Sequence, residues 1–221
     1  MIRVLSKLLD LLFPPKCIFC GKLLKDRETD LCADCSANLP RAEGSVKSIR
    51  FCCEAYARFY YEGKVPESVR RYKFAGREAY ASAYGRQIAL LIMEQNIPFD
   101  ILSYVPVSRR RLRKRGYDQA QLIAEAVGRE LGVSACRCLQ KIRDNQAQSS
   151  LKEIAARNAN VMGVYRIDPK ASVLGKRILL LDDVMTSGST LSECCSVLLS
   201  AGAEEVRCVT LAAAKKLYKK Q

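Results

Sequence analysis

Two adjacent carboxylates, Asp182 and Asp183, follow a short apolar run and precede a loop of small residues. The apolar run, residues 178–181, is continuous and is followed by a helical pattern, which is typical of a strand buried on both faces of a parallel sheet. Ligands of such sheets bind outside the carboxyl ends of the strands. Two acids placed there can accept hydrogen bonds from a vicinal diol or hold hydrated Mg²⁺.

The loop after the acids supplies hydrogen-bond donors. Residues 186–190 read Thr-Ser-Gly-Ser-Thr, so they offer hydroxyls and backbone N–H groups where a helix is predicted to begin, and such a position favours a phosphate. Gly188 permits the tight turn. The acids and the loop together predict a cradle for ribose 5-phosphate. The alternative is a solvated strand end followed by an ordinary helix cap at Ser189 or Thr190.

Four cysteines in two Cys-x-x-Cys pairs give the second chemical signal: Cys17, Cys20, Cys32 and Cys35. Four thiolates at this spacing can surround Zn²⁺ as a tetrahedron, and such a closed site is structural because no coordination position stays open. Disulfides, which a reducing cytosol disfavours, and a redox pair, which needs a βαβ context, are the alternatives. The other cysteines lie in apolar segments and are predicted to be small core residues: Cys52, Cys53, Cys136, Cys138, Cys194, Cys195 and Cys208.

A dense basic segment follows another predicted strand. Residues 105–108, Val-Pro-Val-Ser, lead into Arg-Arg-Arg-Leu-Arg-Lys-Arg at residues 109–115. Interpreted as a loop, this segment carries guanidinium groups that suit diphosphate or nucleic-acid phosphates; a solvated charged loop is the alternative. The polar residues 141–151 could close over a diphosphate as a lid or form an ordinary loop. The candidate phosphate-binding residues are Val105, Pro106, Val107, Ser108, Arg109, Arg113, Lys114, Arg115, Lys141 and Arg143.

Strands and helices alternate along most of the chain, which predicts a parallel, doubly wound α/β sheet. The predicted strands cover residues 56–61, 100–105, 134–139, 161–167, 178–181 and 206–211. The predicted helices cover residues 66–74, 77–95, 117–131, 150–159 and 190–201. A chain of 221 residues can hold one such domain with a small appendage. We expect an amphipathic helix at residues 1–14, a four-cysteine zinc finger at 15–45 and the α/β domain at 50–215.

The net charge of +14 and the pI near 9.4 favour polyanionic partners, namely nucleic acid, anionic lipid or phosphorylated small molecules. Neither a signal peptide nor an apolar run of about 18 residues is found, so we expect a cytoplasmic protein without a membrane span. Leucines recur at helical spacing within residues 5–12. Such an apolar stripe can pack on the protein itself or dock on a membrane surface. Peripheral attachment to the inner membrane therefore stays open.

Several separate motifs, in the order found here, resemble the ComF family of competence proteins. They are the cysteine pairs after Phe-Pro-Pro, Tyr-Lys-Phe-Ala-Gly from Tyr72, Val-Pro-Val with Arg-Gly-Tyr-Asp-Gln, Gln-x-Ser-Leu with Arg-Asn-x-Asn-Val, and the acid block. The acid block itself looks like the PRPP-binding motif of type I phosphoribosyltransferases. The resemblance implies a type I phosphoribosyltransferase fold with a small hood. It also implies a bacterial protein that handles incoming single-stranded DNA during natural transformation.

Carried over by position, the resemblance implies that Asp182 and Asp183 bind the ribose hydroxyls and are the catalytic residues of an active enzyme. The implied cofactors are structural Zn²⁺, held by the four paired cysteines, and Mg²⁺ with PRPP. The implied partners are PRPP or another ribose 5-phosphate ligand, single-stranded DNA, and a competence helicase or another DNA-uptake protein. The implied PRPP-binding residues are Asp182, Asp183, Val184, Met185, Thr186, Ser187, Gly188, Ser189 and Thr190.

Two functions of different classes stay open on the sequence. In the first, the chain is a binding protein whose basic segment follows single-stranded DNA while the cradle captures PRPP or a ribose phosphate. In the second, the chain is an enzyme that transfers ribose 5-phosphate from PRPP to an unknown base or amine, and its cations stabilise the departing pyrophosphate. The sequence identifies no acceptor and leaves turnover of PRPP open.

Overall fold

The computed structural model describes residues 14–25, 27–46, 48–74, 79–143 and 163–218. The helices predicted at residues 1–14 and 150–159 lie outside these ranges, apart from residue 14. Most of the polar segment predicted as a lid also lies outside them. No helix within the described ranges is long and apolar enough to cross a membrane.

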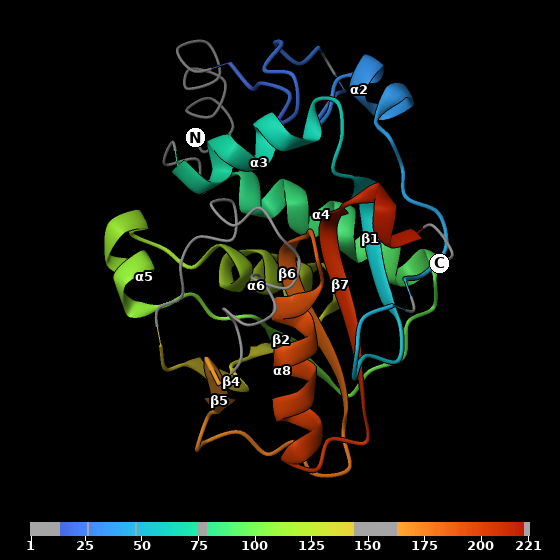
Figure 1. The fold of residues 1–221 in the computed structure, drawn as a ribbon. Helices are drawn as coiled ribbons and strands as arrows, with labels where there is room; N and C mark the ends of the chain where they lie inside the picture. The colour runs from blue at the N-terminus through green and yellow to red at the C-terminus, as the bar shows by residue number, and fades with distance from the viewer. Residues whose placement is uncertain (1–13, 26, 47, 75–78, 144–162, 219–221) are drawn as a thin grey trace.

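Five parallel strands form the central sheet (Figure 1). Each neighbouring pair runs parallel, so the predicted parallel α/β sheet is confirmed. The middle strand is the one that carries the acid pair. In spatial order the strands are β1 (Ala55–Tyr60), β7 (Glu205–Ala213), β6 (Arg177–Met185), β2 (Ile101–Tyr104) and β3 (Ala135–Cys136).

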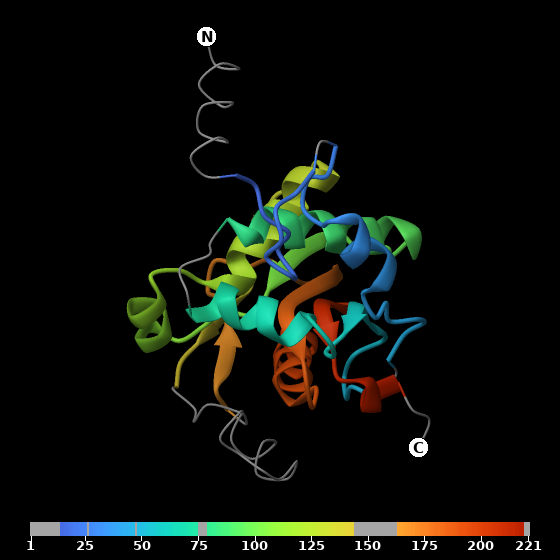
Figure 2. The same cartoon turned by 90° about the horizontal axis from the view of Figure 1, so that it is seen from above.

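The middle strand is buried on both faces. Leu179 and Leu181 of β6 belong to one hydrophobic cluster, whereas Ile178 and Leu180 belong to a second. This division follows from the alternation of side chains along a strand. Helices lie on both sides of the sheet (Figure 2), so the doubly wound arrangement is also confirmed. Among the described helices, α4 (Tyr80–Glu94) and α6 (Gln119–Leu131) contribute to the first cluster, and α8 (Ser189–Ser200) contributes to the second.

The order of the strands reverses between β2 and β6. The chain passes from β2 through α6 to β3 on one side, and from β6 through α8 to β7 on the other. In an open α/β sheet such a switch point opens a crevice at the carboxyl ends of the two strands. Residues 105–108 and the acid pair therefore meet at one place.

The N-terminal cysteine segment shares a hydrophobic core with the α/β domain. Phe19 packs edge-on against Phe59 of β1, with ring centroids 5.2 Å apart. Ser68 of α3 (Val65–Phe74) donates its hydroxyl to the carbonyl of Ile18 at 2.6 Å. The cysteine segment and α3 form one body at the top of Figure 1, where the resemblance implies a small hood.

The basic segment predicted as a loop is a helix, α5 (Arg109–Arg115). Ser108 caps its first turn, because the Ser108 hydroxyl accepts a hydrogen bond from the Arg111 backbone N–H at 3.3 Å. The helix ends at Gly116, whose N–H donates to the Leu112 carbonyl. The prediction was wrong because arginine, lysine and leucine are good helix formers, and a serine cap and a terminal glycine bound the segment.

Parts of two predicted strands lie outside the main sheet. The predicted strand at 134–139 divides into β3 and β4 (Leu139–Lys141), and the one at 161–167 shortens to β5 (Tyr165–Ile167). β4 and β5 form a separate, antiparallel two-stranded sheet. The sequence did not predict this second sheet, because β-prone residues do not specify which strand is the partner.

The strand of the acid pair is longer than predicted. β6 continues through Asp182 and Asp183 to Met185, because β7 runs beside it and Asp182 pairs with Thr210 in register. The two acids therefore lie within hydrogen-bonded strand, and the backbone holds them in place. The chain ends, among the described residues, in a short 3₁₀ turn (Lys215–Tyr218) after β7.

Candidate functional site

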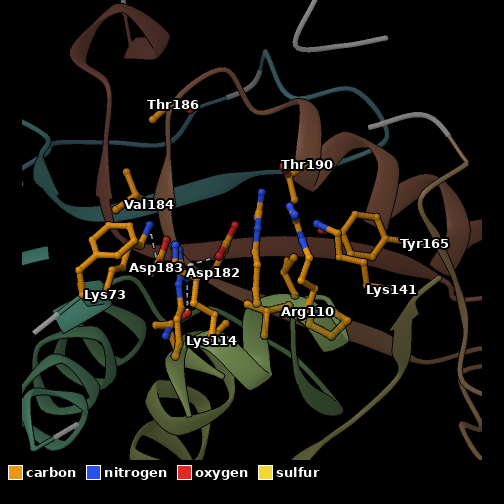
Figure 3. A pocket seen from close by; sticks show the side chains of 18 of the residues that line it. Lys73, Arg110, Lys114, Lys141, Tyr165, Asp182, Asp183, Val184, Thr186 and Thr190 are labelled. Carbon is orange, nitrogen blue, oxygen red and sulfur yellow. Dashed lines mark hydrogen bonds and ion pairs between the residues drawn. The ribbon is translucent and has the colours of Figure 1, made fainter. Parts of the chain in front are cut away.

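A cavity of about 660 Å³ opens at the switch point between β2 and β6. Its walls come from both strand ends, from α3, α5 and α6, and from the β4–β5 pair. Figure 3 shows Lys73 and the two acids on one side, Lys141 with Tyr165 on the other, and Arg110 between them. The charged residues that line the cavity are Lys73, Arg110, Arg111, Lys114, Arg115, Lys141, Asp182 and Asp183.

The acid pair lies in two different environments. Asp182 Oδ1 accepts a hydrogen bond from the Asp183 backbone N–H at 2.8 Å, and Asp183 Oδ2 lies 2.8 Å from Lys73 Nζ in a mostly buried ion pair. Burial, together with the charge of Asp183, raises the pKa of Asp182 to about 7. Asp182 therefore gains or loses its proton near neutral pH, while Asp183 is paired with a cation.

The small-residue loop connects the acids to α8. Thr186 and Thr190 line the cavity, and the hydroxyls of Ser187 and Ser189 lie 2.8 Å apart. Gly188 has a φ of 75° and precedes the first residue of α8. A Cβ atom at Gly188 would clash with the side chain of Ile49, so this turn has no room for a side chain. The N-terminus of α8 can accept an anion there.

The α5 helix supplies most of the positive charge. Arg110, Arg111, Lys114 and Arg115 line the cavity and, at positions i, i+1, i+4 and i+5, share one face of the helix. No residue of α5 is buried, so the helix is held by its ends and by contacts at its inner face. The result is a row of cations facing two carboxylates across the cavity.

Reciprocal hydrogen bonds lock α3 to the start of α6. Tyr72 donates its hydroxyl to the Gln119 carbonyl at 2.8 Å, and Tyr117 donates to the Tyr72 carbonyl. Burial raises the pKa of Tyr72 well above its ordinary value, so its hydroxyl stays protonated. These bonds fix the backbone next to Lys73 and Arg115, which both line the cavity.

Asp118 organises the turn between β2 and α6. Its carboxylate accepts the backbone N–H groups of Val107 at 2.9 Å, Ala120 at 3.1 Å and Gln121 at 3.2 Å. Burial raises the pKa of Asp118, and the backbone donors oppose that rise. Asp118 therefore caps α6 and fixes the loop of residues 105–108 with a single side chain.

The β4–β5 pair forms the far wall. Lys141 Nζ donates to the Tyr165 hydroxyl at 3.2 Å and lies 5.1 Å from the centre of the same ring. Burial raises the pKa of Tyr165 well above its ordinary value. This wall thus presents a lysine and a neutral phenol to the cavity.

The acid pair fits the ligand set of Mg²⁺. Mg²⁺ is bound in proteins by one or two carboxylates together with substrate phosphates and water. Asp182 and Asp183 can supply the carboxylates, and Thr186 and Thr190 carry hydroxyls in the lining of the same cavity. Lys73 would have to release Asp183 for both acids to take part.

The four paired cysteines converge as predicted, and we call them the four-cysteine cluster. The Sγ atoms of Cys17, Cys20, Cys32 and Cys35 all lie within 4.8 Å of one another, and Cys20 Sγ is 3.6 Å from Cys32 Sγ. Cys35 lies on the short helix α2 (Ala33–Asn38). Burial opposes ionisation of Cys17, but backbone N–H groups outweigh it and lower the pKa of its thiol to about 7. This donor set fits Zn²⁺ in a closed tetrahedral site.

The structure divides the predicted phosphate-binding residues into two groups. Val105, Pro106, Val107, Lys114, Arg115 and Lys141 line the cavity. Ser108 caps α5 instead, Arg109 and Arg113 lie on its outer face, and Arg143 donates to the Gly163 carbonyl at 3.1 Å. The helical geometry of α5 separates Arg109 and Arg113 from the cavity, whereas a loop would not have done so.

The predicted ribose-phosphate residues divide in the same way. Those that line the cavity are Asp182, Asp183, Val184, Thr186 and Thr190. Met185 is buried, and the loop residues Ser187, Gly188 and Ser189 shape the turn behind the lining.

Several lining residues were missed by the sequence analysis. Arg110 and Arg111 could have been found from the helical spacing between Ser108 and Gly116. Lys73 and Phe74 lie in a motif noted for its resemblance only, and no spacing connects them with the acid pair. The other missed residues are Tyr61, Gln119, Ala120 and Tyr165.

Two family models match the chain. A phosphoribosyl transferase domain matches residues 118–221, and a double zinc ribbon domain matches residues 8–68. Competence protein ComFC of Streptococcus pneumoniae is 27% identical over 89% of this chain and 99% of its own. The chain is thus similar to the ComF competence proteins and the YhgH proteins. The zinc ribbon match includes the four-cysteine cluster, and the phosphoribosyl transferase match includes β6, the acid pair and α8.

Other relatives are more distant or are matched in part. DNA utilization protein YhgH of Escherichia coli CFT073 is 29% identical over 148 residues, and the chain spans 63% of the length of that relative. Competence protein F of Haemophilus influenzae is 23% identical over 90% of this chain and 97% of its own. Among solved structures, a glutamine PRPP amidotransferase from B. subtilis has a TM-score of 0.44 at 20% identity, covering 64% of this chain and 30% of its own.

Proposed function

We propose that the protein binds single-stranded DNA along α5 and a ribose 5-phosphate ligand, PRPP in the first place, in the cavity, and that it serves DNA uptake or DNA utilisation. The relatives at full length are named competence proteins, and the YhgH relatives are named DNA utilization proteins. A phosphoribosyl transferase domain is the matched family of the C-terminal part. Two features of the surface of this chain support the DNA assignment.

The observation that carries the proposal is the distribution of charge on α5. Six of its seven residues are cationic, and they occupy both faces of the helix. The inner face lines the cavity, whereas Arg109 and Arg113 are exposed on the outer face. A single diphosphate in the cavity would use only the inner cations. A strand of phosphates that crosses α5 would use both sets.

An exposed aromatic ring next to this helix supports the same interpretation. Phe74 is 67% exposed at the rim of the cavity, and the guanidinium of Arg115 lies 4.9 Å from the centre of its ring. Aromatic and guanidinium planes next to a basic groove are the usual stacking surfaces for unpaired bases. Phe74 and α5 together thus offer a base platform and a row for phosphates.

The second candidate function is phosphoribosyl transfer, and the state of Asp182 favours it. In the transfer, the bond between the anomeric carbon and a pyrophosphate oxygen breaks, and a bond from the acceptor nitrogen to that carbon forms. The inner cations of α5 stabilise the charge on the departing pyrophosphate. Asp182, whose pKa is about 7, can accept the proton that the acceptor nitrogen releases.

A titration with labelled single-stranded DNA, with and without PRPP and Mg²⁺, tests the proposal. We expect binding that weakens steeply with salt, and competition by PRPP if the strand crosses the cavity. Absence of DNA binding by a protein that still binds PRPP would contradict the DNA assignment. Acceptor bases and amines would then be screened for release of pyrophosphate.

We also propose that Zn²⁺ in the four-cysteine cluster is structural. The cluster packs in the same hydrophobic core as α3 and α4, and all four positions of a tetrahedron are taken by protein thiolates. Removal of the metal with a chelator should therefore unfold α3 along with the cysteine segment, which far-UV circular dichroism would detect.

A further inference from the structure

Three cysteines outside the four-cysteine cluster converge on one point of the α/β domain. The Sγ atoms of Cys52, Cys195 and Cys208 all lie within 4.8 Å of one another, and we call them the three-cysteine cluster. They come from the turn before β1, from α8 and from β7, so the fold brings together three distant parts of the chain. The sequence analysis predicted all three as small core residues, and their convergence was not visible in their spacing.

One sulfur–sulfur distance in the three-cysteine cluster matches one in the four-cysteine cluster. Cys195 Sγ lies 3.6 Å from Cys208 Sγ, as Cys20 Sγ does from Cys32 Sγ. Metal–sulfur bonds of about 2.3 Å place two thiolates of a tetrahedral site about 3.8 Å apart. Cys195 and Cys208 therefore already have the spacing of two ligands of one cation, and the Cys52 sulfur lies within 4.8 Å of both.

The burial of the three thiols differs in a way that suits a metal site. Cys195 and Cys208 are fully buried, whereas Cys52 is half-buried. Because Cys52 alone of the three has exposed surface, a cation would enter from the side of Cys52. An entry path of this kind is one of the requirements for a metal site.

The backbone before Cys52 is strained. Phe51 has a φ of 62°, a conformation that is rare and unfavourable for a bulky residue. Burial of its ring does not compensate for this, because Phe51 is 51% exposed. The turn directs the thiol of Cys52 inwards, where it lies 3.1 Å from the Glu54 carbonyl, while Cys53 stays exposed. Such strain commonly marks a functional constraint.

We propose that Cys52, Cys195 and Cys208 hold a thiophilic cation of the zinc or monovalent copper class as three thiolates. Soft sulfur ligands select these ions over Mg²⁺ or Ca²⁺. A disulfide would join only two of the three sulfurs and would need them at about 2.05 Å. Simple packing of three small side chains would not require the strained turn at Phe51.

The position of the three-cysteine cluster connects it with the phosphate loop. Cys195 lies on α8, the helix that begins after Gly188, and Ile49, in the turn that carries Cys52, packs against Gly188. A cation that ties α8 to this turn would hold the loop in the shape described above. Metal bound at this cluster would therefore stabilise the loop at the N-terminus of α8, which forms the anion site.

The test is metal counting on the full chain. The protein is loaded with Zn²⁺ under reducing conditions, passed over a weak chelator and analysed for metal. We expect two equivalents in the wild type and one in Cys52→Ser, with the four-cysteine cluster keeping its ion. The control variants Cys194→Ser and Cys53→Ser should each keep two equivalents of zinc. Cys194 is a buried cysteine on the same helix and Cys53 is the neighbour of Cys52, yet neither belongs to the cluster.

A parallel titration with Cu⁺ against a competing copper chelator identifies the ion. Binding of Cu⁺ that Cys52→Ser abolishes, with only one zinc in the wild type, supports the proposal with copper as the cation. Equal metal content in the wild type and in Cys52→Ser for both ions would overturn it. A disulfide between Cys195 and Cys208 in peptides of the reduced, metal-treated protein would overturn it as well. Cys52 is half-buried, so its serine variant is expected to fold, and the thermal midpoint checks this.

Discussion

The two sides of the cavity are built by different means. The acidic side is part of the sheet: Asp182 and Asp183 lie in hydrogen-bonded strand, and the turn at Gly188 is closed by Ile49. The basic side is an exposed helix, α5, without a buried residue. Atoms fixed by the backbone of the sheet suit a ligand of one shape, such as a ribose phosphate. A row of long cationic side chains suits any ligand with spaced phosphates.

This contrast indicates which side sets the specificity of the protein and which side sets the affinity. The acids and the loop can select a ribose 5-phosphate by geometry. The cations of α5 attract phosphates without distinguishing their carrier, since a phosphate contact carries no sequence information. Changes on each side should therefore have separate effects on PRPP and on DNA.

The largest expected effect comes from removal of both acids. In the double variant Asp182→Asn with Asp183→Asn, PRPP affinity with Mg²⁺ should fall by about 100-fold or more, because two hydrogen bonds to charged groups are lost. Affinity for single-stranded DNA should be retained or should rise, since negative charge is removed from the cavity. Isothermal titration calorimetry measures the affinity for PRPP, and fluorescence anisotropy measures the affinity for single-stranded DNA. Equal loss of DNA binding would show that the acidic side itself holds the strand.

Removal of the exposed ring at the rim should affect DNA more than PRPP. Phe74→Ala is expected to weaken single-stranded DNA binding by about 1–3 kcal/mol through the loss of one stacked base. Leu174→Ala is the control: Leu174 is an apolar residue that is 77% exposed, and it does not line the cavity. If both variants bound DNA alike, Phe74 would not be a stacking surface.

The outer arginines separate a strand of phosphates from a single ligand. Arg109→Gln with Arg113→Gln should lower the salt dependence of DNA binding by about two ion equivalents and leave PRPP binding unchanged. The inner pair, Arg110→Gln with Lys114→Gln, should weaken both ligands. Anisotropy at several salt concentrations gives the slopes. An outer variant with wild-type DNA affinity would mean that only the cavity binds phosphate.

The smallest effect concerns pH. Because the pKa of Asp182 is raised to about 7, the protonated form stabilises the folded, ligand-free protein, and this contribution is lost as the pH rises through about 7. Asp182→Asn should remove that pH dependence, which thermal unfolding at several pH values measures. PRPP affinity should change in the opposite sense and rise a few-fold between about pH 6 and pH 8, because ionised Asp182 binds the ribose hydroxyls or Mg²⁺ better. A flat affinity profile would contradict a role for ionised Asp182 in binding.

The fold and the acidic side were largely predictable from the sequence. A continuous apolar strand, two acids and a small-residue loop follow one another in the chain, so local order is enough to place them. The basic side was not predictable from the sequence. Its geometry depends on whether residues 109–115 form a loop or a helix, because the helix decides which arginines face the cavity. Lys73 could not be predicted either: its pairing with Asp183 depends on how α3 packs over the sheet. The three-cysteine cluster likewise depends on contacts between distant segments.

The shared core of the cysteine segment and the α/β domain has a consequence for the living cell. Arg86 of α4 donates two hydrogen bonds, of 2.6 and 2.5 Å, to the Asp30 carboxylate. Arg71 of α3 donates to the Phe19 carbonyl at 2.8 Å. The cysteine segment is thus an integral part of the folded core, and we expect its deletion to destabilise the α/β domain. With the proposed zinc in this cluster, scarcity of zinc would reduce the abundance of the whole protein through misfolding and proteolysis.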